Sequence, residues 1–151
     1  MEKSAVPILK GEIMRRPYIK TVSSTASSVL AGGTVPIGTT LVTGYCKAAM
    51  TLNGNSSVSI NDNCINGYLI AVNATFTAPA AGTVVLNVSR NGTPIEGATA
   101  SAVVSTANTE VQSMSFTTTV KSLIAAPDTL SIVNAGVAAD FSNVELDIYR
   151  L

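Results

Sequence analysis

The 151-residue sequence contains no histidine and no tryptophan, and only 12% of its residues are charged. Because histidine is the most common general base and metal ligand in proteins, its absence excludes Ser-His-Asp and Cys-His catalytic sets and argues against a zinc enzyme. The sequence also lacks an apolar run long enough to cross a membrane as a helix. Disorder is excluded as well, because 46% of the residues are hydrophobic and the net charge is zero.

Cysteine is scarce, and Cys46 and Cys64 are the only two. Two cysteines without histidine and without a CxxC motif do not make a zinc site, so we expect no metal and no cofactor. Whether the two thiols pair in a disulfide stays open, and two small buried thiols are the favoured interpretation.

No set of acidic residues has the pattern of a catalytic or calcium site. Asp140, Glu145 and Asp147 are close in sequence, but the last two alternate with apolar residues at outward positions of a predicted strand. We interpret them as solvated charges rather than as a catalytic carboxylate pair. Residues 61–63 are Asn-Asp-Asn, which predicts a turn because no further oxygen ligands follow at calcium-binding offsets. The sequence therefore predicts no catalytic residues and a protein that is not an enzyme.

The few charges are divided unevenly along the chain. Residues 1–20 carry five basic and two acidic side chains, whereas residues 21–151 carry four basic and seven acidic ones, so a net charge of +3 precedes one of −3. The first of these segments also contains many apolar side chains, which favours a docking arm that becomes ordered on a partner surface. The candidate docking residues of this arm are Ile8, Leu9, Ile13, Arg15, Arg16 and Tyr18.

Two other functions of the arm are disfavoured. Lys10 and the Arg15-Arg16-Pro17 sequence interrupt what would be the apolar core of a secretory signal, so we expect the protein to mature in the cytoplasm. A net charge of +3 with one aromatic residue is small for nucleic-acid binding, because phosphate affinity grows with the number of basic contacts. Residues 21–33 are rich in Ser, Ala and Gly and are predicted to form a flexible linker to a domain of residues 34–151.

Apolar and polar residues alternate with period two from about residue 34 onward, which is typical of half-buried β-strands. The clearest run covers residues 68–76, and the Asn91-Gly92 pair is the strongest hairpin signal in the sequence. Short strands are expected at residues 39–43, 48–52, 58–60, 68–76, 84–88, 98–104, 111–120, 130–134 and 144–151, the last of them inside a sheet. Strands separated by turns at intervals of roughly 8–12 residues predict an all-β antiparallel sandwich or jelly roll.

The outward positions of these strands carry Thr, Ser, Asn and Ala instead of the usual Lys and Glu, for example in residues 117–119 and in the alternating Ala98, Ala100 and Ala102. Charged side chains normally protect exposed sheet edges from association with other chains. A surface with so few of them favours a protein whose faces are covered by copies of itself or by a larger lattice.

Four segments in the chain carry a family resemblance, and they are Phe76–Thr83, Asn91–Ala98, Asp128–Asn134 and Phe141–Leu151. In this order they resemble a turn, a hairpin, the penultimate strand and the final strand of the C1q/TNF-like jelly roll, which occurs at the tips of bacterial spore-surface fibres and in many phage structural proteins. The resemblance covers roughly residues 65–151 and implies a compact homotrimer with the final strand near the threefold axis. Its candidate trimer-interface residues are Tyr68, Phe116, Phe141 and Tyr149.

Together these observations predict a virion structural protein of a bacteriophage, a trimeric capsid decoration or head-fibre protein made in the host cytoplasm. Its extended N-terminal arm would bind the major capsid protein or another virion protein, and its jelly roll would point outward from the capsid surface. One alternative is a fibre-tip module that binds a host receptor or surface glycan, but most aromatic residues fall at inward positions, where sugars cannot stack on them. Another is a spore-surface or cell-surface trimer, which the absence of a collagen-like Gly-X-Y stalk disfavours.

Overall fold

A computed structural model describes residues 16–44, 49–61, 64–122 and 127–151, except for the side chains of residues 64–66 and 122. These residues form eleven β-strands and no α-helix. The strands are β1 (Tyr18–Ser23), β2 (Ser27–Val29), β3 (Thr39–Thr43), β4 (Met50–Asn53), β5 (Ser57–Ile60), β6 (Cys64–Thr77), β7 (Gly82–Arg90), β8 (Thr93–Val104), β9 (Gln112–Ser122), β10 (Asp128–Asn134) and β11 (Ala139–Arg150). All the strands predicted from the sequence are present as β3 to β11, with ends that differ by a few residues.

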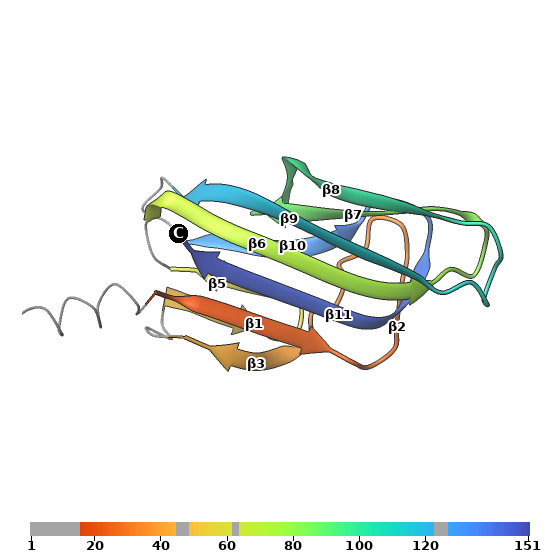
Figure 1. Ribbon diagram of the computed structural model, residues 1–151, viewed down its shortest axis with the longest axis horizontal. Helices are drawn as coiled ribbons and strands as arrows, with labels where there is room; N and C mark the ends of the chain where they lie inside the picture. Colours follow the sequence, from red (N-terminus) through yellow and green to blue (C-terminus); the bar gives the residue numbers. More distant parts are fainter. Residues whose placement is uncertain (1–15, 45–48, 62–63, 123–126) are drawn as a thin grey trace, which may run out of the picture.

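The strands form two antiparallel sheets that pack face to face (Figure 1). The six-stranded sheet has the order β3-β1-β11-β6-β9, with β2 also paired to β11, and it lies nearest the viewer in Figure 1. The five-stranded sheet behind it has the order β4-β5-β10-β7-β8. From β5 onward the chain passes repeatedly between the two sheets, which is the connectivity of a jelly roll. The prediction of an all-β antiparallel jelly roll is confirmed.

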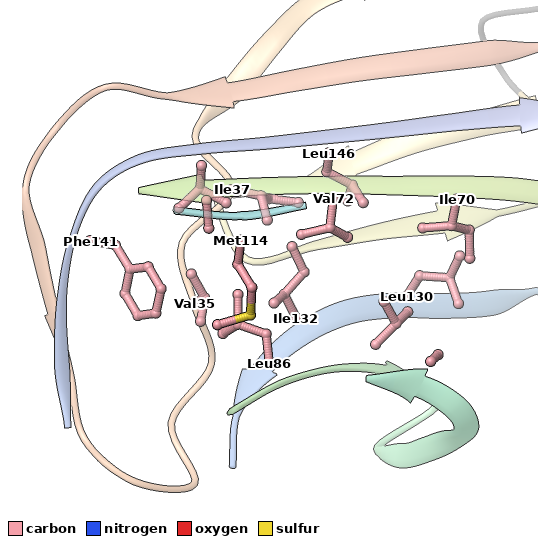
Figure 2. Close-up of a cluster of buried hydrophobic side chains, with 14 of the residues drawn as sticks. Val35, Ile37, Ile70, Val72, Leu86, Met114, Leu130, Ile132, Phe141 and Leu146 are labelled. Carbon is pink, nitrogen blue, oxygen red and sulfur yellow. The ribbon is translucent and has the colours of Figure 1, made fainter. Parts of the chain in front are cut away.

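The core lies between the sheets and is built by the inward side chains of their central strands. On β6 the even-numbered residues from Tyr68 to Phe76 are buried and the odd-numbered ones point outward, as the period-two pattern predicted. Figure 2 shows Leu86, Ile132 and Leu146, which come from both sheets, within this core. Each such side chain contributes roughly 1.5–3 kcal/mol when it is removed from water. The core is therefore the main source of stability of the sandwich.

Strand β11 lies in the middle of the six-stranded sheet, as predicted for the last strand. It pairs along its length with β6, and its other edge pairs with β1 and β2. Both edges of β11 are therefore hydrogen-bonded within the sheet. The outward side chains of β11 lie between neighbouring strands rather than at a sheet edge, so they are less accessible to water.

The N-terminal boundary of the jelly roll differs from the prediction of an arm to residue 20 and a flexible linker over residues 21–33. Strands β1 and β2 cover much of this region, and both pair with β11. Ile19 and Thr21 of β1 are buried. The domain therefore begins near Tyr18, and residues 1–15, most of the predicted arm, lie outside the described residues.

The sequence pattern of β1 does not predict a strand, because Lys20 and the serines that follow it weaken the period-two alternation of apolar and polar residues. What stabilises β1 is its pairing with β11, whose residues lie more than a hundred positions away in the sequence. A pairing of that kind has no local signature.

The hairpin between β7 and β8 turns at Asn91 and Gly92, as predicted. Both residues have positive φ, 52° and 84°, which is the geometry of the two-residue turn that Asn-Gly favours. Asn91 Oδ1 also accepts a hydrogen bond from Thr129 N (2.8 Å), which ties the hairpin to β10. Ser89 was predicted to be an outward, solvated position but is buried. It keeps its regular place opposite Ser131 of β10, and the pairing of β7 with β8 changes register beside it, between Asn87 and Ser89.

Candidate interaction surface

The described residues hold no group of three or more His, Cys, Asp or Glu side chains that could bind a metal ion. Within the same residues, no helix has the length and hydropathy needed to cross a membrane. Cys46 and the side chain of Cys64 lie outside what the structure describes, so the question of a disulfide stays open. The features that offer a function are the outer faces and ends of the sandwich.

We define the outer face of the six-stranded sheet as the side chains of β1, β11, β6 and β9 that point away from the core. Residues that lie opposite each other on neighbouring strands share a face, so the strand register arranges these side chains in rows. Three rows cross the sheet in the strand order β1, β11, β6 and β9. The first row is Tyr18, Tyr149, Leu69 and Thr119, and the second is Lys20, Asp147, Ala71 and Thr117. The third row is Val22, Glu145, Asn73 and Ser115. Figure 1 looks onto this face, and no other described strand crosses it.

The first row begins with two stacked tyrosines. The ring centroids of Tyr18 and Tyr149 are 5.4 Å apart, with 18° between the ring planes, and Tyr149 remains 41% exposed. Gly44 lies so close to the Tyr18 ring that a Cβ at this position would overlap it, and the Gly44 N–H donates to Tyr18 O (2.9 Å). The tyrosine pair forms a half-exposed aromatic patch where β1 begins and β11 ends.

The next two rows contain a charged cluster. Lys20 Nζ lies 3.3 Å from Glu145 Oε2 and 4.0 Å from Asp147 Oδ1. Asn73 Nδ2 donates to Glu145 Oε1 (3.2 Å), and Ser115 Oγ donates to Asn73 Oδ1 (2.5 Å). The hydrogen bond with Glu145 and the charge of Asp147 raise the pKa of Lys20, so its ammonium group stays protonated. With one ammonium and two carboxylates ionised, the cluster carries a net negative charge.

Asp147 is the least solvated member of this charged cluster, with 9% of its surface exposed. Its Oδ1 atom is buried without a hydrogen bond, and the Lys20 ammonium group is beyond hydrogen-bond distance. Burial raises the pKa of Asp147, Lys20 opposes this effect, and Glu145 adds to it. The interpretation of Asp147 as a solvated charge is therefore wrong, because β11 is a central strand flanked by β1 and β6.

The outer face of the five-stranded sheet presents uncharged side chains along the middle of β7 and β8. The register places outward, side by side, Thr83 and Val103, Val85 and Ser101, and Asn87 and Thr99. The predicted surface of Thr, Ser and Asn is thus present on this sheet. The alternating alanines that begin at Ala98 point inward, contrary to the prediction, because the hairpin and bulge set the register of β8 with Ala98 in the core.

Three exposed apolar side chains lie at the end of the sandwich opposite the tyrosine pair. Val103 stands next to the end of β8, Val111 precedes β9, and Leu30 follows β2, with exposed fractions of 63%, 65% and 75%. Strand β6 ends and β7 begins at this same end. The two ends of the sandwich therefore differ in the side chains that they present.

No protein-family model and no curated protein sequence matches this chain, but solved structures resemble it. The structure of Eiger TNF from S. frugiperda has a TM-score of 0.61 at 16% identity, over 90% of this chain and 94% of that one. The globular domain of zebrafish complement 1qA protein also has a TM-score of 0.61, at 9% identity, over 89% of this chain and 97% of that one. The fold is a C1q/TNF-like jelly roll.

A virion protein also has a similar structure. The vertex protein P5 of phage PRD1 has a TM-score of 0.51 at 10% identity, over 89% of this chain and 96% of that one. At sequence identities this low, the similarity of this chain to the three solved structures establishes its fold and nothing about its function.

The four predicted interface residues fall into two groups according to whether their side chains are buried in this domain or exposed on its surface. Tyr68 and Phe141 are only 1% exposed and belong to the core of a single copy, so they are not available to a neighbouring copy. Phe116 is half-buried and packs against the same core. Tyr149 is exposed on the outer face of the six-stranded sheet. The first three fall at inward positions of the period-two pattern, which is why their side chains point into the sandwich.

The predicted docking residues are placed only in part. Ile8, Leu9, Ile13 and Arg15 lie outside the described residues. Arg16 is exposed, and Tyr18 belongs to β1 and stacks on Tyr149 rather than extending from the domain. The pairing of Lys20 with Glu145 was not predicted, because it depends on the register between β1 and β11, which has no local signal in the sequence.

Proposed function

We propose that this C1q/TNF-like domain is a structural protein of a virus particle, a trimeric capsid decoration or head-fibre protein. Three copies associate through the outer faces of their six-stranded sheets. Residues 1–17 dock on the major capsid protein or another virion protein, and the jelly roll is displayed outward. The protein acts by assembly, with no catalytic step.

The observation that carries this proposal is the outer face of the six-stranded sheet. Tyr149 and Leu69 present aromatic and aliphatic surface there, and the small side chain of Ala71 allows a neighbour to approach closely. Protein interfaces are enriched in aromatic side chains such as tyrosine. A face with this aromatic and aliphatic surface, which no other described strand covers, fits association with a second copy.

The two ends of the domain support an anchored and displayed arrangement. Tyr18 pairs with Tyr149, so the chain enters the sheet at the end where β11 finishes (Figure 1). The basic and apolar arm is thus attached at one end, while Leu30, Val103 and Val111 are exposed at the other. An anchor at the base and an exposed surface at the far end are what a capsid decoration protein needs.

Two further features support a place in the virion. The likeness to the vertex protein P5 of phage PRD1 indicates that a virion protein has a fold of this kind. The low charge of the chain, at 12% of its residues, fits a protein whose sheet faces and edges are covered by neighbours in an assembly.

Two deletions test the role of the arm. Pro17 O accepts a hydrogen bond from Arg150 N (3.0 Å), so removal of residues 1–16 leaves the pairing of β1 with β11 complete, whereas removal of residues 1–20 takes away half of β1. We expect the shorter deletion to remain trimeric in light scattering and to lose co-sedimentation with capsids of the virus that carries this gene. The longer deletion should also unfold at a lower temperature. A shorter deletion that still binds capsids contradicts the docking role.

Two substitutions test the trimer itself. Tyr149→Glu places a carboxylate on the outer face of the six-stranded sheet, and Val103→Glu places one at an apolar position that is also exposed but lies far from this face. Light scattering should give a trimer for the full chain and for the Val103 variant, and a smaller species for the Tyr149 variant. If both variants dissociate, or if both remain trimeric, the assignment of the interface to this face is contradicted.

A further inference from the structure

We infer that the association of copies of this chain is coupled to the uptake of a proton by Asp147, so that the trimer becomes tighter as the pH falls. This inference rests on the proposed trimer and adds a means of regulation to it. The observation behind it is the charged cluster of the outer face.

The charges of this cluster do not balance. Lys20 supplies one positive charge, and Glu145 and Asp147 supply two negative charges, so every copy brings an uncompensated negative charge to the outer face. Around a threefold axis, three such charges would enter a surface from which water is excluded. A carboxylate that loses water without gaining a partner takes up a proton instead of remaining ionised.

The proton goes to Asp147 rather than to Glu145 because of their hydrogen bonds. Glu145 accepts one from Asn73 Nδ2 at 3.2 Å and lies 3.3 Å from the Lys20 ammonium group, so its charge is well compensated. Asp147 Oδ1 has no hydrogen bond, and the ammonium group is 4.0 Å away. The carboxylate with the fewer partners is the one that association destabilises more.

The strands around Asp147 supply no second cation at close range. Besides Lys20, Glu145 and Tyr149, the only titratable group that β1 and β11 turn toward it is Tyr18. The side chains that flank Asp147 on the neighbouring strands β6, β9 and β3 are all uncharged. They are Leu69, Ala71 and Asn73 of β6, Thr117 and Thr119 of β9, and Val42 of β3. Arg16 and Lys121 lie beyond the tyrosine row. Among the described residues, no second cation lies close enough to neutralise the excess charge of each copy, so a proton takes this role.

The direction of the pH dependence follows from the sign of the pKa change. Burial already raises the pKa of Asp147 in the single copy, and coverage by a neighbour raises it further. The associated state then binds the proton more tightly, so association strengthens as the pH falls toward the ordinary range of an aspartate and weakens as the pH rises. Each proton taken up on association changes the association constant by about tenfold per pH unit, so one proton in each of three copies changes the constant of the trimer by up to about a thousandfold per pH unit.

Sedimentation equilibrium of the full chain, between about pH 8 and pH 5 at constant ionic strength, measures this coupling. We expect the wild-type association constant to rise at least about tenfold over this range. Asp147→Asn should give a tight trimer whose constant does not depend on pH. Glu96→Gln, which removes a carboxylate from an exposed position of β8 on the other sheet, should behave like the wild type.

A second variant covers the case in which the Asp147 substitution does not fold. Lys20→Gln removes the only cation of the cluster, so the trimer should be weaker at the upper end of the range and its pH dependence steeper. A wild-type trimer with a constant that does not change with pH, or an Asp147→Asn variant that keeps the wild-type slope, overturns the coupling and leaves the trimer standing. A chain that stays single at every pH overturns the proposed trimer and the coupling together.

Discussion

The buried side chain of Asn134 holds three segments of the fold together, and we predict that Asn134→Asp will strongly destabilise the protein. Asn134 is fully buried; its Nδ2 donates to Val137 O (2.8 Å) and Val29 O (3.3 Å), and its Oδ1 accepts from Gly136 N (3.1 Å). The aspartate has nearly the same shape but no Nδ2–H groups. Both carbonyl oxygens would then face a carboxylate instead of a donor.

The magnitude follows from the two donors that are lost. A buried acceptor left without its donor costs about 1–3 kcal/mol, so the free energy of unfolding should fall by about 2–6 kcal/mol. The total for a single domain is roughly 5–15 kcal/mol, so this is a large share of it. The buried carboxyl group would have a raised pKa, and its folded form would bind a proton more tightly than the unfolded chain does. The destabilisation should therefore be largest above that pKa and shrink as the pH falls through it.

Urea denaturation at neutral and at mildly acidic pH measures this effect, with Asn87→Asp as the matched control. Asn87 lies on β7 opposite Val133 and points outward, so the same substitution leaves the new carboxylate close to water and should change the free energy of unfolding by less than about 0.5 kcal/mol. Equal losses for the two variants would refute the role given to the Asn134 hydrogen bonds. A loss for Asn134→Asp that does not shrink at acidic pH would refute the assignment of the cost to a buried charge.

Three further changes test other parts of the fold. Gly44→Ala should lower the unfolding temperature, at a cost of about 1–3 kcal/mol, because its Cβ would overlap the Tyr18 ring; an unchanged temperature would contradict this close packing. Ile132→Ala in the core should cost about 2–5 kcal/mol in urea denaturation, well above Val133→Ala on the outer side of the same strand, and similar costs would contradict the two-sided packing. Hydrogen bonds from Gln112 and from two backbone amides of the loop before β9 lower the pKa of Glu110. The ionised Glu110 side chain therefore stabilises this loop above the ordinary pKa of a glutamate, and this stabilisation is lost as the pH falls through the lowered pKa of the folded protein. Amide exchange in this loop should therefore be less protected at acidic pH in the wild type and already less protected at neutral pH in Glu110→Gln.

The strands with a strong local signal were predictable from the sequence. Strand β6 alternates without interruption from Tyr68 to Phe76, and the Asn91-Gly92 pair has the backbone freedom that its turn requires. Strand β1 was not predictable in this way, because Lys20 interrupts its pattern and its stability comes from pairing with β11. The change of register between β7 and β8 beside Ser89 also has no local signal, since it depends on how the two strands pair.

The candidate surface was predictable only in part. The outward positions of Glu145 and Asp147 follow from their alternation with apolar residues. Their environment does not, because the same alternation occurs at a sheet edge, where the charges are solvated, and in a central strand, where neighbouring strands displace water.

By itself, the sequence determined the fold class, the inward or outward phase of the long strands and the scarcity of charge, because these depend on residue type and on a two-residue period. Only the tertiary structure decided which strands are neighbours, and this follows from pairings between residues far apart in the chain. That order puts Lys20 beside Asp147 and buries a carboxylate that the sequence alone presents as a surface charge. It also makes three of the four predicted interface aromatics part of the packing of a single copy and leaves Tyr149 on the outer face.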